Sequence, residues 1–228
     1  MIVLKIKDPT RRAAYIKDFS IQKYFSVPIE NYLEVHTFRK GEFICEERKA
    51  PQRLYFIKEG EVQLYLIHQD GNVSLAQYYQ PGDVLGELEL LGIRSQSQSI
   101  QAIKDTVCIA LPFDPCKDKI LADPVFMQNL CRFIADKMLR SVGKLVSTQT
   151  YPLENRLAAF LIDREERPGD WITLRLTDLA QYLGVSYRHL SRVVKQFSDA
   201  GWIHKDRTRL RIINNDALEE LVAQMETE

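Results

Sequence analysis

The sequence predicts an α+β protein with a β-roll first, one long helix next, and a small helical domain with a β-hairpin last. Short β segments separated by glycine turns fill the first half, and helical apolar spacing takes over after Asp123-Pro124. A helix-turn-helix pattern follows near the C-terminus. Of the 228 residues, 45% are hydrophobic and 27% are charged, a balance typical of a folded globular chain with one or two domains.

The predicted β-roll spans residues 1–122. Its strand segments are apolar or alternating and end at turn residues; they read EVHTF, EFICE, LYFIK, EVQLYLI, NVSLAQYY and VCIAL. Glycine recurs at the bends, in the tripeptides Lys40-Gly41-Glu42, Glu59-Gly60-Glu61 and Pro81-Gly82-Asp83. This spacing favours stacked antiparallel turns over a parallel sheet with crossover helices.

One long helix is predicted over residues 123–150, with Asp123 as its cap and Pro124 in its first turn. Two stripes of positions recur at steps of three or four residues; they are Met127, Cys131, Ile134, Met138, Ser141 and Leu145, and Leu139, Val142 and Val146. Such a helix can pack on its own domain and on a partner helix at once. The alternative is a helix folded entirely on its own sheet, but a length of about 39 Å favours a homodimer.

The C-terminal domain, residues 151–228, begins where Tyr151-Pro152 interrupts the helical pattern. Within it, Thr177 and Ser186 are each placed to cap a helix, and Gly184 to allow the turn between the two helices. Small or apolar residues take the interior positions, which are Leu179, Ala180, Leu183, Val185, Leu190 and Val193. The pattern favours a DNA-binding helix-turn-helix over an ordinary corner between two helices.

Basic residues mark the outward face of the second helix. Arg188, Arg192 and Lys195 are spaced to share one stripe, with Tyr187 and Ser191 beside them. Arginine can donate two hydrogen bonds to a guanine edge, and lysine can bind phosphate. Two short strands are predicted within residues 202–213, and this hairpin or wing carries Lys205, Arg207, Arg209 and Arg211. Residues 186–213 hold seven basic and two acidic residues, as expected for a nucleic-acid interface.

Over the whole chain, 31 basic and 31 acidic residues cancel, so any attraction to nucleic acid is local. The sequence has no apolar run of membrane-spanning length and no secretory signal, which favours the cytoplasm without a membrane partner. It also lacks a nucleophile elbow, a phosphate-binding loop and paired histidines. His36 and His68 are single, whereas a cupin-type metalloenzyme needs several converging histidines. We therefore expect neither an enzyme nor a metal site.

The chain resembles the CRP/FNR superfamily of bacterial transcription regulators over nearly its full length. The resemblance rests on the segment PGDVLGEL at residues 81–88, the long helix and the winged helix-turn-helix. The segments YPLENRLAAF and YLGVSYRHL look closest to the YeiL-like branch. The resemblance implies a cyclic-nucleotide-binding-type β-roll, a dimer through the long helix, and RNA polymerase as the partner of an activator. Its base-reading positions carry over onto Tyr187, Arg188, Ser191 and Arg192.

The resemblance also implies an effector pocket. It places a ribose-binding carboxylate at Glu87, a phosphate-binding pair at Ser97 and Gln98, and a base contact at Ser141. The arginine that holds the cyclic phosphate in cyclic-AMP receptors is absent from that pair, and a buried phosphate without it loses its charge-assisted contacts. The sequence therefore disfavours cyclic AMP and leaves the effector unknown, including the alternative of a regulator that needs no small ligand.

The four cysteines, Cys45, Cys108, Cys116 and Cys131, form no Cys-x-x-Cys pair. An iron–sulfur cluster would need four converging thiolates, and this cluster or thiol redox sensing remains an alternative input. Cys116, between Pro115 and Lys117, is predicted to lie in a loop as the most reactive thiol. The other three are interpreted as small buried apolar residues.

Together these observations predict a sequence-specific transcription regulator. It would bind double-stranded DNA as a homodimer on an inverted-repeat site, under a signal received at the β-roll. The alternative is a cyclic-nucleotide-type sensor whose C-terminal domain binds a protein partner. A basic outer face on the second helix and the wing argues against that alternative.

Overall fold

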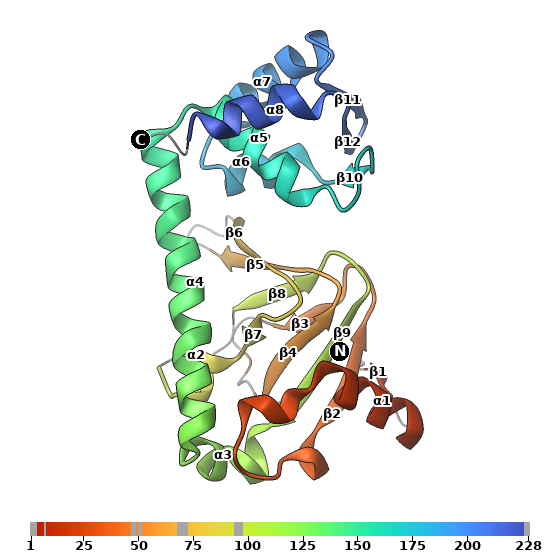
Figure 1. The fold of residues 1–228 in the computed structure, drawn as a ribbon, viewed down its shortest axis with the longest axis vertical. Helices are drawn as coiled ribbons and strands as arrows, with labels where there is room; N and C mark the ends of the chain where they lie inside the picture. The colour runs from red at the N-terminus through yellow and green to blue at the C-terminus, as the bar shows by residue number, and fades with distance from the viewer. Residues whose placement is uncertain are drawn as a thin grey trace. The chain divides into compact units, whose positions relative to one another are not determined.

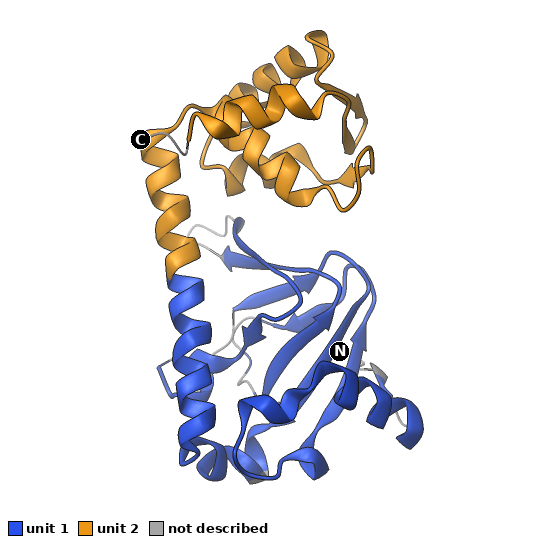
Figure 2. Cartoon of the chain, in the orientation of Figure 1, with its two compact units in different colours: residues 1–138 blue, residues 139–228 orange. Residues whose placement is uncertain are grey.

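The chain forms two compact units, residues 1–138 and residues 139–228 (Figure 2). A computed structural model describes residues 4–6, 8–46, 49, 52–67, 73–93 and 98–225. The division between the units falls within the long helix α4 (Pro124–Thr150), so each unit holds part of that helix. Strands and helices both contribute to the two units, which confirms the α+β fold class.

Two antiparallel sheets in the first unit form the predicted β-roll (Figure 1). Their strand orders are β1-β2-β9-β4-β7 and β3-β8-β5-β6. The strands are β1 (Leu4–Lys5), β2 (Glu34–Phe38), β3 (Phe43–Cys45), β4 (Arg53–Glu59), β5 (Val62–Ile67), β6 (Val73–Tyr79), β7 (Val84–Leu85), β8 (Ser99–Ala102) and β9 (Thr106–Pro112). The six expected strand segments are confirmed. The sequence did not indicate β1, β7 and β8, because strands this short carry too little alternation.

Glycine is required where the strands turn. Gly60 has φ +91°, and a Cβ there would lie 2.5 Å from the Asp105 carbonyl oxygen. Gly86 also has φ +91°, and a Cβ there would lie 2.7 Å from the Arg53 carbonyl oxygen. Only a residue without a side chain fits such a left-handed backbone at this approach. Gly60 therefore confirms the glycine turn predicted at that position.

A hydrophobic core joins one face of the roll to the helices around it. The helices of this unit are α1 (Pro9–Phe19), η1 (Ile21–Tyr24), η2 (Glu30–Tyr32), α2 (Glu87–Leu90), α3 (Phe113–Leu121) and the first part of α4. Phe25 stacks on Phe126 of α4 with ring centroids 4.8 Å apart, and Tyr24 stacks on Phe56 of β4 at 5.9 Å. These contacts hold the first half of α4 against the roll.

Asp123 caps α4, as predicted, and it also anchors the N-terminal segment. Its carboxylate accepts hydrogen bonds from the Val125 amide at 2.9 Å and from the amide and hydroxyl of Ser26 at 2.7 and 2.6 Å. Burial opposes ionisation, but the hydrogen bonds from Ser26 and the first turn of α4 hold the pKa of Asp123 below its ordinary value. The start of α4 is thus fixed to a segment about 100 residues earlier.

Replacement of Asp123 by alanine is expected to lower the free energy of unfolding by about 2 kcal/mol, because it removes a helix cap and unpairs buried donors. The pKa of Asp123 is lower in the folded protein than in the unfolded chain. The stabilisation is therefore complete at pH values above the pKa of the unfolded chain, and it is lost as pH falls through the pKa of the folded protein. Urea unfolding at several pH values measures it. Asp118→Ala, at an exposed position on α3, is the control. Identical acid dependence of the wild type and Asp123→Ala would contradict the assignment.

The apolar side chains of α4 divide between two environments. Phe126 and Leu130 are buried, and Met127 and Ile134 pack half-buried on the core of the roll. Farther along lies a row of large apolar side chains that are each at least half exposed, here called the α4 apolar row: Met138, Leu139, Val142, Leu145 and Val146. Within the first unit, α4 packs on the core of the roll through residues 126–134. Cys131, expected to be buried, is exposed.

The second unit contains helices around a three-stranded sheet of order β10-β12-β11. Its elements after α4 are α5 (Leu153–Arg164), β10 (Ile172–Thr173), α6 (Leu176–Tyr182), α7 (Tyr187–Asp199), β11 (Ile203–Asp206), β12 (Arg209–Ile212) and α8 (Asn215–Ala223). The Nδ2 of Asn155 donates to the Leu221 carbonyl at 2.8 Å, which ties α5 to α8. The predicted hairpin is confirmed, and β10 adds an unexpected third strand to it.

The last turns of α4 pack on α6 within this unit. The Lys144 ammonium lies 3.8 Å from the centroid of the Tyr182 ring. Burial lowers the pKa of Lys144 to about 8. Farther along, a Cβ on Gly184 would be 3.5 Å from the Thr148 side chain, so this end of α4 also lies close to the turn after α6. The two ends of α4 therefore belong to different packed bodies.

Candidate nucleic-acid interface and the cavity of the roll

Helices α6 and α7 form the predicted helix-turn-helix. Ser186 caps α7, since its hydroxyl accepts a hydrogen bond from the His189 amide at 3.2 Å. Gly184 in the turn has φ +68°, as the pattern required. The interior residues are buried except for half-buried Val185. The cap expected at Thr177 is wrong: α6 begins at Leu176, so Thr177 lies inside the helix. Arg175 occupies the cap position; its side chain forms no capping hydrogen bond and pairs with Asp178 at 2.8 Å.

One face of α7 is apolar and buried, and the other is basic and exposed. Leu190, Val193, Val194 and Phe197 are buried. Arg188, Arg192 and Lys195 are exposed. Beside them, Tyr187 is exposed and Ser191 is half-buried. These residues line one surface hollow together with Ser186 and His189. The sequence analysis did not include His189 in this surface. The position of His189 in the first turn of a capped helix could have indicated that it lies there.

The β11–β12 hairpin places a second group of basic residues around an aromatic ring. The guanidinium carbons of Arg209 and Arg211 lie 4.8 and 4.9 Å from the centroid of the Trp171 ring, at cation–π distance. Arg209 also pairs with Asp206, while Arg211 is half-buried. Lys205 and Arg207 are exposed. The ring of Trp171, which sequence reasoning missed, thus positions two of the four wing cations.

A small cavity lies within the first unit, between the roll and α4. Cys45, Tyr79, Glu87, Gln98 and Lys137 line it together with apolar side chains. Of the pocket expected from the sequence, Glu87 and Gln98 are at this cavity, and Ser97 falls outside the described residues. Ser141 is exposed and does not line it; on α4 that place belongs to Lys137, about one turn earlier. No local pattern in the sequence pointed to Lys137, because its partners are on distant strands.

Lys137 makes three contacts at this cavity. Its ammonium donates to Glu87 Oε1 at 2.8 Å and to the Val84 carbonyl oxygen, and it lies 4.7 Å from the centroid of the Tyr79 ring. The side chains of Lys137 and Glu87 are only 14% and 9% exposed. The ion pair is therefore largely shielded from water, and solvent screens it less than a surface pair.

The residues at this cavity do not fit a cyclic nucleotide. The cavity has a volume of about 50 Å³, whereas pockets for small organic ligands are commonly about 300–1,000 Å³. Glu87, which would meet the ribose, is already paired with Lys137. A second carboxylate, Glu89, also lines the cavity.

Cys116 is not the exposed loop thiol that the sequence predicted. It lies inside α3, fully buried, with its thiol donating to the Pro112 carbonyl oxygen at 2.7 Å. Burial raises the pKa of Cys116 and disfavours the reactive thiolate. The prediction failed because Pro115 lies within the first turn of a helix that begins at Phe113, where proline is tolerated, rather than in a loop.

Native Cys116 is accordingly expected to react with iodoacetamide at least about tenfold more slowly than the same residue in urea, because the thiolate is disfavoured and the sulfur is covered. Peptide mass spectrometry after timed labelling measures this directly. Cys131, which is exposed, provides an internal reference in the same samples. Equal rates for Cys116 in native and unfolded protein would contradict its burial.

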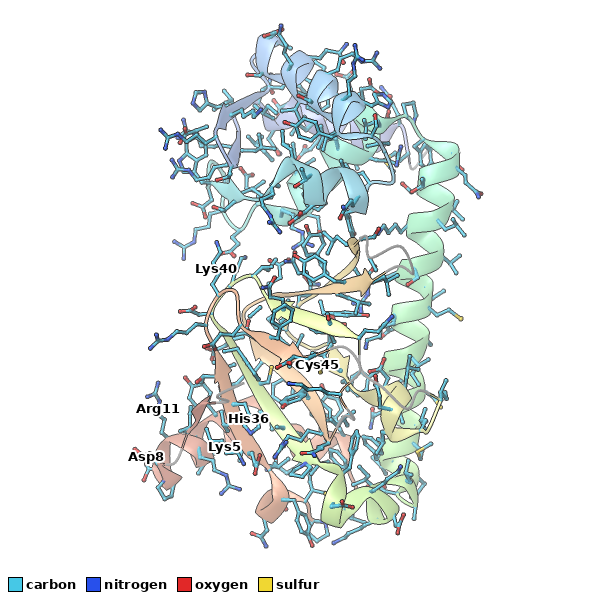
Figure 3. All side chains as sticks on the ribbon, turned by 180° about the vertical axis from the view of Figure 1, so that it is seen from behind. Lys5, Asp8, Arg11, His36, Lys40 and Cys45 are labelled. Carbon is cyan, nitrogen blue, oxygen red and sulfur yellow. The ribbon has the colours of Figure 1, made fainter. Side chains whose placement is uncertain are left out.

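His36 is a buried structural histidine of β2. Lys5 faces it on β1, and both are labelled in Figure 3. A hydrogen bond of 2.8 Å joins His36 Nε2 to Glu34 Oε2, and burial lowers the pKa of His36. Burial alone would raise the pKa of Glu34, but hydrogen bonds with Lys5 and His36 lower it to about 2. Within the described ranges, no group of three His, Cys, Asp or Glu side chains is arranged to hold a metal ion.

Among the described helices, none has both the length and the apolar character needed to cross a bilayer. His68, the other histidine of the first domain, lies outside the described residues.

Comparison with known proteins agrees with both halves of this architecture. The cyclic nucleotide-binding domain model matches residues 35–122, and the Crp-like helix-turn-helix domain model matches residues 155–221. The regulatory protein YeiL of Escherichia coli O157:H7 is 34% identical over 191 residues, covering 84% of this chain and 86% of that protein. The fumarate and nitrate reduction regulatory protein of Escherichia coli K12 is 23% identical over 212 residues, covering 89% and 84%.

Solved structures give the same fold. A transcriptional regulator of the CRP/FNR family from Thermus thermophilus matches with a TM-score of 0.70 at 22% identity, covering 83% of this chain and 98% of that one. At this identity the match concerns the fold alone.

Proposed function

The chain belongs to the CRP/FNR family of transcription regulators, and we propose that it acts as a homodimer that binds an inverted-repeat DNA site through α7 and the β11–β12 wing. One observation carries the proposal: α7 is capped, buried on its apolar face and basic on its exposed face. Because the chain as a whole has no net charge, this local concentration of cations supports a binding surface for polyanionic DNA.

The exposed side chains suit two different contacts. Tyr187, Arg188, Ser191 and Arg192 lie on the first half of α7, from which a recognition helix reads base edges in the major groove. Lys195, Lys205, Arg207, Arg209 and Arg211 would contact the phosphate backbone. The stacking of Arg209 and Arg211 on Trp171 supports this role, since ordered guanidinium groups lose less conformational entropy on binding.

The homodimer would form through the α4 apolar row. Five large apolar side chains exposed along one helix form the kind of patch that marks an interaction site. A second copy of α4 offers the complementary apolar surface, and the resulting two-fold symmetry matches an inverted repeat. Two recognition helices about 34 Å apart would then enter successive major grooves.

The proposed organisation has three parts: a sensor roll (residues 1–122), a dimerisation helix (123–150) and a DNA-binding domain (151–228). We propose further that the protein is cytoplasmic and not an enzyme. RNA polymerase would be its partner in activation. The signal received at the roll is unidentified.

Selection from a random pool of DNA duplexes tests the function. The purified full-length protein is incubated with the pool as isolated, reduced, oxidised, and with added cyclic AMP. We expect enrichment of a two-fold-symmetric site in the reduced protein without ligand. The variant Arg188→Ala/Arg192→Ala is the control and should enrich no site. An absence of enrichment in every condition would favour the alternative of a protein-binding C-terminal domain.

A further inference from the structure

We infer that the Lys137–Glu87 ion pair takes the place of an effector in the roll, and that it fixes α4 in the DNA-binding form without any small ligand. This inference rests on the proposed DNA-binding function and adds how the roll would control it. The observation behind it is that Lys137 of α4 lines the cavity between α4 and the roll and is paired there with Glu87.

Lys137 connects α4 to three separate parts of the roll. Its ammonium pairs with Glu87 on α2 at 2.8 Å, donates to the Val84 carbonyl on β7, and lies 4.7 Å from the Tyr79 ring on β6. A bound effector at the same place would connect the same elements to α4. The contacts that a ligand would supply are thus present within the chain itself.

The ion pair also excludes an anionic ligand. An incoming phosphate or carboxylate would have to displace Glu87 from Lys137, and a buried carboxylate left without its partner is strongly destabilising. The remaining volume of about 50 Å³ has room for a few water molecules, each of which needs about 10–15 Å³ of such space.

The position of Lys137 along α4 explains how the ion pair could control the dimer segment of the helix. Residues 126–134 of α4 pack on the core of the roll, and Lys137 lies about one turn beyond them. The next six residues, 138–143, are exposed, and the α4 apolar row begins there. Lys137 therefore ties down α4 just before the segment that the proposed dimer uses. Its loss would free that segment to take more than one orientation.

Three variants of the full-length protein test the inference: Lys137→Met, Glu87→Gln and the charge exchange Lys137→Glu/Glu87→Lys. The affinity of each for the enriched duplex is measured by fluorescence anisotropy, without and with cyclic AMP. Lys137→Met is expected to bind at least about tenfold more weakly than wild type because the competent form is less populated. The charge exchange should recover part of that loss, and cyclic AMP should change the wild-type affinity less than about twofold.

The matched control is Lys5→Met, which removes a lysine ion-paired with Glu34 at 2.7 Å on another part of the roll. It should bind DNA like the wild type. Thermal melts followed by circular dichroism identify variants that fail to fold. Hydrogen exchange provides a second readout that needs no DNA: amides of residues 134–142 should exchange faster in Lys137→Met than in the wild type or in Lys5→Met.

The outcomes separate the inference from the function. Wild-type affinity in Lys137→Met with unchanged exchange in α4 would overturn the inference and leave the DNA-binding function standing. A wild type that binds its site only after cyclic AMP is added would overturn it as well. A wild type that enriches no DNA at all would contradict the proposed function, and the exchange comparison would still decide whether Lys137 holds α4.

Discussion

Replacing Arg192 with alanine is expected to weaken binding to the enriched site by roughly 5- to 150-fold, corresponding to about 1 to 3 kcal/mol. Arg192 is exposed on the capped half of α7, where a guanidinium can donate two hydrogen bonds to one guanine. The loss should be confined to duplexes that carry the contacted base. Competition binding against single-base variants of the site measures that pattern. For Arg192→Ala, substitutions at one base pair of the site should no longer change the affinity.

The matched control is Arg209→Ala on the wing. Arg209 stacks on Trp171 and pairs with Asp206, and its proposed role is to contact the backbone rather than to read a base. This variant should weaken binding to every duplex alike, and the slope of log K against log salt concentration should fall by about one. If the two variants show the same sequence preference and the same salt slope, the division between reading and positioning residues is wrong.

Leu139→Glu is expected to convert the dimer into a monomer and to lower DNA affinity by at least about a hundredfold. Leu139 is 65% exposed in the single chain and lies in the α4 apolar row. A glutamate there would be buried without a partner at the dimer interface, which is costly. Because linked recognition helices gain about 10² to 10⁴ in affinity from being held together, the monomer loses that gain. Sedimentation velocity and anisotropy measure the two effects.

Leu139→Met is the control at the same position, since it keeps an apolar side chain of similar volume. It should remain a dimer and bind DNA within about twofold of the wild type. A dimer that survives Leu139→Glu would place the interface elsewhere. If Leu139→Glu is a monomer and still binds DNA with wild-type affinity, binding does not need a dimer, and the proposed two-fold-symmetric site is wrong.

The helix-turn-helix could be predicted because its determinants are local. Ser186 caps α7 through an amide three residues along the chain, Gly184 takes the left-handed turn, and the buried positions follow helical spacing. Each of these depends only on neighbours within a few residues. The start of α6 was misplaced by two residues because Thr177 looked like a cap, whereas Arg175 occupies the cap position.

The cavity could not be predicted in the same way. Lys137 and Glu87 are 50 residues apart, and they meet only because the closed roll brings α2 beside α4. The resemblance to the CRP/FNR superfamily located Glu87 and Gln98 at the cavity. It placed the residue of α4 that lines the cavity at Ser141, whereas that residue is Lys137. Trp171 escaped notice for the same reason, because its stacking partners are on β12, far along the chain. Long-range pairs leave no periodic signal in a sequence.

Helix α4 is continuous across the boundary between the two units, with Lys137 held by the roll and Lys144 held by Tyr182. An α-helix turns by about 100° and rises 1.5 Å for each residue. One residue inserted between these two anchors would therefore turn the helix face that carries Lys144 by about 100° relative to the face that carries Lys137. Seven inserted residues would restore the two faces to within about 20° and lengthen the helix by about 10 Å. The number of residues between Lys137 and Lys144 thus sets the angle between the two packed faces of α4, so a length change that is harmless in a loop would here bring other side chains of the helix to one of the two contacts.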